Sequence, residues 1–186
     1  MKAVSNTGPL IWLAKYSKMH LLKLLFKEVL IPKAVYHEAV EQGFIYGYQD
    51  AAAISNAVEE EWIKVAEAPR EDIEKVKTLE QKLHIELGEG EREAIVLAAS
   101  KKIKVLLVND EEAARTAKLL NLTPRGTLYI LLKAVKQKIL AKQEAWDLLV
   151  KIIGDGFWIS PKLIAQILQI CLRKVTTHTF ILMLYF

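Results

Sequence analysis

Short runs of apolar, often β-branched residues alternate along this chain with longer stretches in which apolar residues recur every three or four positions. A short run of this kind predicts a buried strand, and the longer spacing predicts an amphipathic helix. Strands are therefore expected at residues 2–5, 29–31, 62–65 and 105–108. Helices are expected at residues 10–16, 19–26, 32–40, 51–60, 69–84, 91–99, 111–120, 128–138 and 142–153, with a loop at 43–50 and a turn at 123–127.

This alternation of strands with helices predicts an α/β fold. A strand followed by helices usually returns to a parallel neighbouring strand through a right-handed crossover. The expected architecture is a central parallel sheet with helices on both faces, which makes three α/β/α layers. This domain should occupy residues 1–160, and residues 161–186 should form a C-terminal helix followed by a β-prone apolar tail.

Composition narrows the class of protein further. The 186 residues are 52% hydrophobic, which is enough for a sizeable core, and a net charge of +4 permits a polyanionic partner. Because Cys171 is the only cysteine, an internal disulfide framework and a cage of metal-binding thiolates are both excluded. No signal peptide is recognisable, and no apolar run approaches the ~20 residues of a membrane span. We therefore expect a cytoplasmic protein with no membrane partner.

Polar side chains follow two of the predicted strands. The strand at residues 105–108 is followed by Asp110 and Glu111, and the strand at residues 2–5 is followed by Asn6. The carboxyl ends of parallel strands share one edge of a sheet, where ligands of open α/β folds bind. Asn6 and Asp110 are therefore expected on the same edge. The alternative for Asp110 is a helix cap, with Glu111 complementing the helix dipole.

Two predicted helices carry glutamates on otherwise apolar faces. Glu38 shares a helix face with Val35, and Glu91 shares one with Ile95, so both carboxylates should point towards the protein. A buried carboxylate must be paired or must bind a metal ion. Glu93 lies on a second apolar stripe and is a weaker candidate. The alternatives are a Glu38 that reaches water, and charges that merely complement a helix N-terminus for Glu91 and Glu93.

Other common catalytic groupings are missing from the sequence. The four histidines are isolated and lack the spacing of metal ligands. A phosphate loop, a dinucleotide-binding glycine fingerprint and a Gly-x-Ser-x-Gly elbow are not present either. An all-oxygen carboxylate site suits Mg²⁺ or Mn²⁺, and such ions polarise a phosphoryl group and activate water. In a basic protein, this chemistry favours hydrolysis of nucleic-acid phosphodiesters.

Four segments, in this order, resemble the PIN-domain nuclease family, and especially its toxin-like, nucleic-acid-binding branch. They are residues 4–11, 31–38, 87–95 and 108–115, the last followed by 126–127. The resemblance implies a PIN-like α/β/α fold and a metal-dependent endoribonuclease. It also implies a catalytic site around Mg²⁺ or Mn²⁺ that is made of Asn6, Glu38, Glu91, Asp110 and Glu111.

The same resemblance implies further contacts. Thr7 and Thr127 are expected to bind a metal-bound water or a phosphate, and Arg115 is expected to contact substrate. The alternative for Arg115 is an ion pair with Glu111, which lies four residues earlier on the predicted helix. The expected partners are RNA, an antitoxin protein that covers the site, and a second copy of the chain in a homodimer.

One residue departs from the family pattern. Asn6 stands where the family usually has Asp. An amide oxygen can ligate a hard cation but brings no charge, so metal binding should be weaker. The alternative function is therefore a weakened or inactive PIN-like protein that binds nucleic acid or regulates. A third, structural interpretation treats the carboxylates as helix caps and solvated charges.

Overall fold

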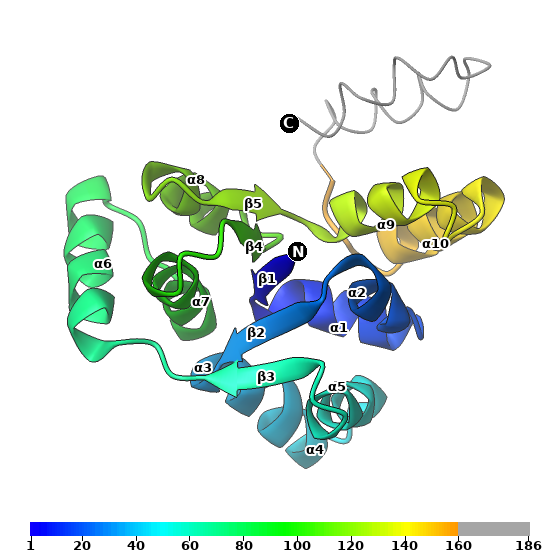
Figure 1. The fold of residues 1–186 in the computed structure, drawn as a ribbon, viewed down its shortest axis with the longest axis horizontal. Coiled ribbons are helices and arrows are strands. Elements are labelled where there is room, and N and C mark those ends of the chain that lie inside the picture. Colours follow the sequence, from blue (N-terminus) through cyan, green and yellow to red (C-terminus); the bar gives the residue numbers. More distant parts are fainter. Residues whose placement is uncertain (160–186) are drawn as a thin grey trace. The chain divides into compact units, whose positions relative to one another are not determined.

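The computed structural model describes residues 1–159, and residues 1–141 of these form a five-stranded sheet with helices on both faces (Figure 1). All four strand pairs are parallel, and the strand order is β3-β2-β1-β4-β5. This confirms the predicted α/β/α architecture. The strands are β1 (Lys2–Ser5), β2 (Glu28–Pro32), β3 (Ile63–Ala66), β4 (Val105–Leu107) and β5 (Thr123–Arg125).

Most of the helices occur where hydrophobic periodicity predicts them, with small shifts at their ends. They are α1 (Thr7–Lys15), α2 (His20–Leu25), α3 (Lys33–Tyr36), the π-helix η1 (His37–Gln42), α4 (Gly43–Ile45), α5 (Gln49–Glu59), α6 (Arg70–Leu83), α7 (Glu89–Ser100), α8 (Glu111–Leu119), α9 (Thr127–Lys136) and α10 (Lys142–Gly154). Residues 1–141 form one compact unit, and α10 belongs to a second unit that begins at Lys142. The helix and tail predicted beyond residue 160 lie outside the described residues.

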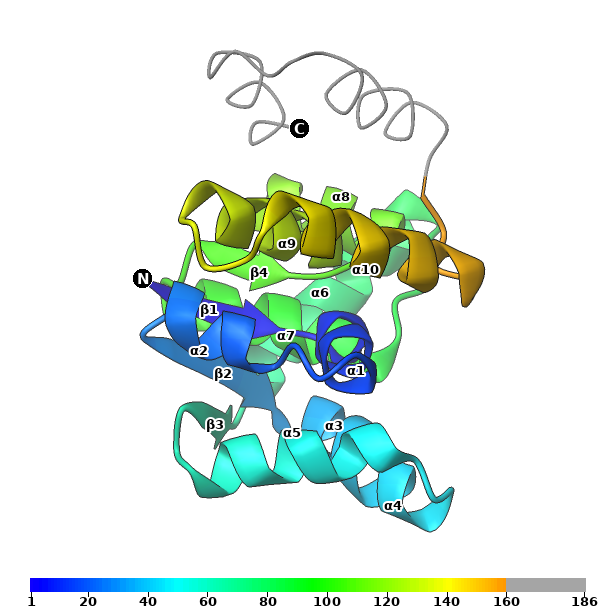
Figure 2. The ribbon, with the colours of Figure 1, turned by 90° about the vertical axis from the view of Figure 1, so that its right-hand side faces the viewer.

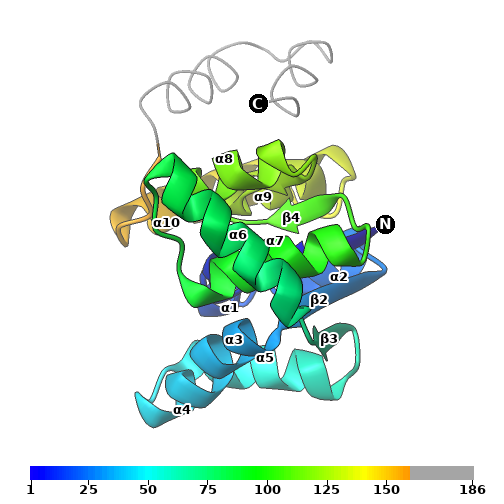
Figure 3. The same ribbon diagram turned by 90° about the vertical axis from the view of Figure 1, so that its left-hand side faces the viewer.

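Two groups of helices cover the sheet. Helix α7 packs on β1, β2 and β4, with α6 lying over α7 (Figure 3) and α8 beside it. Helices α1, α2 and α9 pack together on the opposite side (Figure 2). Residues 94–98 of α7 are each at most 1% exposed, because this helix is apolar almost all round and lies between the sheet and α6.

Two local predictions are wrong. Residues 123–127 were expected to form a turn, but Thr123–Arg125 is the edge strand β5. Residues 43–50 were expected to form a loop, but η1 continues into α4 through Gly43. A Cβ at Gly43 would lie only 2.8 Å from the Ala51 Cβ, so this glycine permits helix packing rather than a turn.

Strand β1 lies at the point where the order in which successive strands join the sheet reverses. The first crossovers run from β1 through β2 to β3, and the later ones run from β4 to β5 on the other side of β1. Such a switch point opens a crevice at the carboxyl ends of the two central strands, β1 and β4.

Among the described residues, no helix is both long enough and apolar enough to cross a membrane.

Candidate functional site

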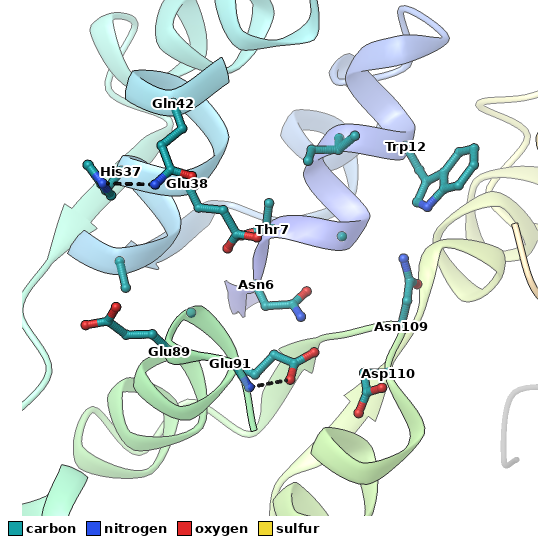
Figure 4. A pocket seen from close by; sticks show the side chains of 15 residues that line it. Asn6, Thr7, Trp12, His37, Glu38, Gln42, Glu89, Glu91, Asn109 and Asp110 are labelled. Atoms are coloured by element: carbon teal, nitrogen blue, oxygen red, sulfur yellow. Dashed lines mark hydrogen bonds between the residues drawn. The ribbon is translucent and has the colours of Figure 1, made fainter. Parts of the chain in front are cut away.

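An open pocket of about 630 Å³ lies at the carboxyl ends of β1 and β4 (Figure 4). A hydrogen bond of 3.0 Å from the Asn6 N–H to the Leu107 carbonyl holds these two strand ends together. Side chains from four separate parts of the chain meet in the pocket. Its lining comprises Asn6, Thr7, Gly8, Ile11, Trp12, Ala34, His37, Glu38, Gln42, Gly88, Glu89, Gly90, Glu91, Asn109 and Asp110.

Asn6 follows β1 and is only 5% exposed. Its Oδ1 atom is buried and has no hydrogen-bond partner within the described part of the chain. An unpartnered buried polar atom costs about 1–3 kcal/mol, so a ligand that offers a positive charge or a donor would bind here favourably. Figure 4 shows the Asn6 amide between Glu91 and Asn109.

Glu38 enters the pocket from η1, a rare helix type that is frequently found at functional sites. Its Oε2 atom accepts a hydrogen bond of 2.6 Å from the Thr7 hydroxyl. The same oxygen lies close to α7, because a Cβ at Gly90 would be 3.1 Å from it. Thr7 therefore orients a pocket carboxylate, and Gly90 leaves the space in which that carboxylate lies.

Glu91 enters the pocket from the first turn of α7. Its Oε2 atom accepts a hydrogen bond of 3.1 Å from the Gly88 N–H and so satisfies a backbone donor at the start of α7. Burial raises the pKa of Glu91, and the nearby charges of Asp110 and Glu38 raise it further, against the opposing effect of the Gly88 amide. Burial and the neighbouring carboxylates thus make ionisation of Glu91 less favourable, and a bound cation would relieve this effect.

Asp110 both caps a helix and lines the pocket. Its Oδ1 atom accepts a hydrogen bond of 2.8 Å from the Ala113 N–H at the start of α8. In Figure 4 the Glu91 carboxylate points towards Asp110. The cap interpretation and the site interpretation of Asp110 are therefore compatible, because a carboxylate has a second oxygen that remains available.

The other predicted site residues do not line the pocket. Glu111 and Arg115 form an exposed ion pair on α8, which was the alternative for Arg115. Glu93 accepts a hydrogen bond of 3.2 Å from the Ala34 N–H and so ties α7 to α3. Thr127 is buried at the start of α9.

Asn109 is a pocket residue that sequence reasoning missed. Its Oδ1 atom accepts hydrogen bonds from the backbone N–H of Thr127 (2.8 Å) and from the Thr127 hydroxyl (3.1 Å). The available signal was its position, since Asn109 follows a buried strand as Asn6 does. Trp12, Gln42 and His37 also line the pocket and were not predicted to do so.

A largely buried ion pair between Arg92 and Glu80 fixes the start of α7. Arg92 donates to both carboxylate oxygens of Glu80, at 2.6 and 3.0 Å, and to the Leu87 carbonyl at 2.7 Å. Glu80 also accepts from the Leu87 N–H at 2.7 Å. Burial acts to raise the pKa of Glu80, but the hydrogen bonds from Arg92 and Leu87 outweigh it and hold that pKa below its ordinary value. This network positions the turn from which Glu91 enters the pocket.

The donor atoms of the pocket fit a hard divalent cation in chemical type. They are oxygens, and one of them, Asn6 Oδ1, has no other partner among the described residues. However, within residues 1–159 no three His, Cys, Asp or Glu side chains lie close enough together to hold a metal ion as they stand. Three of the pocket carboxylates are instead bonded to donors of the protein, which an ion would have to displace or share: Glu38 to Thr7, Glu91 to Gly88, and Asp110 to Ala113.

Comparisons with known proteins identify the family. The chain is similar in structure to VapBC2 from Rickettsia felis, solved bound to a DNA fragment from their promoter, with a TM-score of 0.53 and 13% identity over 68% of this chain and 98% of that chain. It is also similar to VapBC-1 from nontypeable Haemophilus influenzae, with a TM-score of 0.51 and 15% identity over the same shares of the two chains. At these identities the likeness is one of fold.

No curated protein matches the chain in sequence. The family model of the PIN domain, by contrast, matches residues 2–172, which extends past the domain boundary expected at residue 160. A match over nearly the whole length shows that the chain belongs to the PIN-domain family.

Proposed function

We propose that this chain is a PIN-type endoribonuclease that hydrolyses RNA phosphodiester bonds with Mg²⁺ or Mn²⁺. The observation that supports the proposal is the convergence of four oxygen-bearing side chains in one pocket of a PIN-domain chain. They come from the ends of β1 and β4, from η1 and from the first turn of α7: Asn6, Asp110, Glu38 and Glu91.

These four side chains would hold the ion, and Glu111 directly follows one of them, Asp110, in the sequence. A bound divalent ion lowers the pKa of water and neutralises charge on a phosphoryl group. Thr7 holds the Glu38 carboxylate in place through its hydroxyl. Attack of water on the phosphodiester would leave a 5′-phosphate and a 3′-hydroxyl.

Substitutions at Asp110 test this function. Asp110→Asn keeps an N-cap acceptor, because Asn and Asp cap helices about equally well, but it removes the charge. Mn²⁺-dependent cleavage of a mixed-sequence RNA should therefore be lost in Asp110→Asn and in Asp110→Ala, while only Asp110→Ala should also lose stability. The matched control is Asp50→Asn, which removes a first-turn carboxylate from α5 and should cleave normally. Full activity of Asp110→Asn would refute the proposal.

A second candidate function is RNA binding without cleavage. One observation in favour of this function is that Asn6 carries no charge. The other is that, within residues 1–159, no three His, Cys, Asp or Glu side chains lie close enough together to hold a metal ion. The two candidates predict different outcomes for Asn6→Asp. If the natural chain binds RNA without cutting it and Asn6→Asp restores Mn²⁺-dependent cleavage, the binding function is correct.

We also infer that the chain works in the cytoplasm with a protein partner. Support comes from its toxin-like resemblance and from the similar fold of the two VapBC proteins. An antitoxin that covers the pocket and a second copy of the chain are the proposed partners. Co-expression of the chain with the product of an adjacent gene, followed by measurement of the mass of the complex, tests both.

A further inference from the structure

The orientation of the Asn109 amide is determined by its partners. Two groups of Thr127, its backbone N–H and its hydroxyl, both lie against one end of this amide. A backbone N–H can only donate, so the atom that it meets must be the amide oxygen. The amide nitrogen Nδ2, with its two protons, therefore faces away from Thr127.

The Asn109 Nδ2 atom is buried and has no hydrogen-bond partner in the described part of the chain. Leaving such a donor unpaired costs about 1–3 kcal/mol. The residue lines the pocket between the ends of β1 and β4, beside Trp12 and Asp110 (Figure 4). A ligand in this pocket that carries an acceptor would satisfy the donor.

Two glycines give the Asn109 amide its space. A Cβ at Gly8, in the first turn of α1, would lie 3.2 Å from Nδ2. A Cβ at Gly126, at the start of α9, would lie 3.1 Å from Oδ1. Because larger residues at either position would displace the amide, its placement depends on three separate segments of the fold.

The charges around the pocket restrict how an anion can be held there. Glu38, Glu89, Glu91 and Asp110 line it, and among its described lining residues there is no Lys or Arg. A phosphate group must therefore be held by a cation or by neutral hydrogen-bond donors. Asn109 supplies a neutral donor next to Gly8, which has no side chain and so leaves the first turn of α1 exposed to the pocket.

We propose that Asn109 is a phosphate-binding residue, whose Nδ2 donates a hydrogen bond to a non-bridging oxygen of the RNA phosphodiester. This assignment rests on the proposed function for the identity of the ligand. It gives Thr127 an indirect role, since Thr127 orients the Asn109 amide and does not itself meet the substrate.

Nuclear magnetic resonance tests the contact without any cleavage. The uniformly ¹⁵N-labelled full chain is titrated with dimethyl phosphate, a small anionic phosphodiester, in the presence of Mg²⁺. The side-chain NH₂ signals of Asn109 are assigned by their loss in Asn109→Asp. They should shift saturably with dimethyl phosphate and should not shift with the neutral trimethyl phosphate. No shift, or the same shift with both compounds, would overturn the proposal.

A variant pair supplies the second measurement. Asn109→Asp keeps an oxygen acceptor for Thr127 but replaces the donor and adds a negative charge. Asn109→Ala removes the donor, together with the Thr127 acceptor, without adding charge. Losing one charge-assisted hydrogen bond should weaken dimethyl phosphate binding, followed at the Gly8 backbone signal, about tenfold to a hundredfold in both variants. Asn56→Asp, which makes the same charge change at an exposed site on α5, should bind within about twofold of the natural chain. Unweakened binding in Asn109→Ala would overturn the proposal.

The two proposals fail in different ways. If the chain cleaves RNA but Asn109 does not respond to dimethyl phosphate, the ribonuclease function stands and the phosphate-binding role is wrong. If Asn109 responds but RNA is not cleaved with Mg²⁺ or Mn²⁺, the phosphate-binding role stands and the ribonuclease function is wrong.

Discussion

Removing the Glu80 carboxylate should loosen the start of α7 and with it the Glu91 side of the pocket. Glu80→Ala deletes the acceptor of three hydrogen bonds, one from the Leu87 N–H at 2.7 Å and two from Arg92 at 2.6 and 3.0 Å. It also leaves Arg92, whose side chain is only 17% exposed, without its counter-charge.

Breaking a buried ion pair by removing one partner costs about 3–5 kcal/mol. For a chain of this size, each kcal/mol lowers the midpoint of thermal unfolding by about 2–4 °C. Glu80→Ala should therefore unfold about 6–20 °C lower than the natural chain. Glu74→Ala on the same helix is the matched control. It removes an exposed ion pair with Lys77, so its cost should stay below about 1 kcal/mol.

The pH dependence identifies the ion pair as the cause. The pKa of Glu80 lies below its ordinary value of 4.5, so its contribution to the free energy of unfolding is present above pH 4.5 and is lost as the pH falls through the folded-state pKa. The difference in the free energy of unfolding between the natural chain and Glu80→Ala should therefore become smaller below pH 4.5.

Urea unfolding followed by circular dichroism from pH 7 to pH 3.5 measures this difference. If Glu80→Ala lowers the free energy of unfolding by less than about 1 kcal/mol at pH 7, this ion pair does not stabilise the start of α7. A difference that stays constant in acid would show that lost packing, rather than lost charge, causes the destabilisation.

Three further substitutions test the pocket. Asn6→Asp adds a charge to the proposed metal donors, so calorimetry should show Mn²⁺ affinity rising at least about tenfold; unchanged affinity would remove position 6 from the site. Glu91→Gln removes a carboxylate whose pKa is raised above 4.5, so in the absence of metal the midpoint of thermal unfolding should rise at pH 7. This rise should disappear below pH 4.5, where the carboxyl group is protonated in both the folded and the unfolded chain. A lower midpoint at pH 7 would contradict the account. Gly90→Ala would place a Cβ 3.1 Å from Glu38 Oε2 and should weaken Mn²⁺ binding severalfold, whereas Gly88→Ala, whose nearest contact is 3.6 Å, should not; equal effects of the two would argue against a role for Glu38.

Hydrophobic periodicity predicts most of the fold because the strands and helices of this chain bury nearly continuous apolar faces. It does not predict β5, because Thr123, Pro124 and Arg125 offer no apolar run, and proline is tolerated only at the edge of a sheet. It also misreads Gly43 as a loop signal. The reason for that glycine is the close approach of Ala51, which is a tertiary contact and leaves no local pattern.

The candidate site is predictable only in part. Glu38 and Glu91 are indicated by their places on apolar faces and Asp110 by its place after a strand, and all three line the pocket. Their role as metal ligands stays a prediction. Asn109 carries no charge, and its orientation depends on Thr127, which is 18 residues later in the chain. Its position directly after a buried strand is therefore the one signal that the sequence offers for it.

The central claim is that Asn6, Glu38, Glu91 and Asp110 form one metal site. A crystal structure of the full chain grown with Mn²⁺, with the ion located by its anomalous scattering, tests this most directly. The account predicts a peak in the pocket within ~2.0–2.5 Å of the Asn6 Oδ1 atom and of at least two of the three carboxylates. A pocket without Mn²⁺ at saturating concentration, or Mn²⁺ bound only elsewhere, would contradict it.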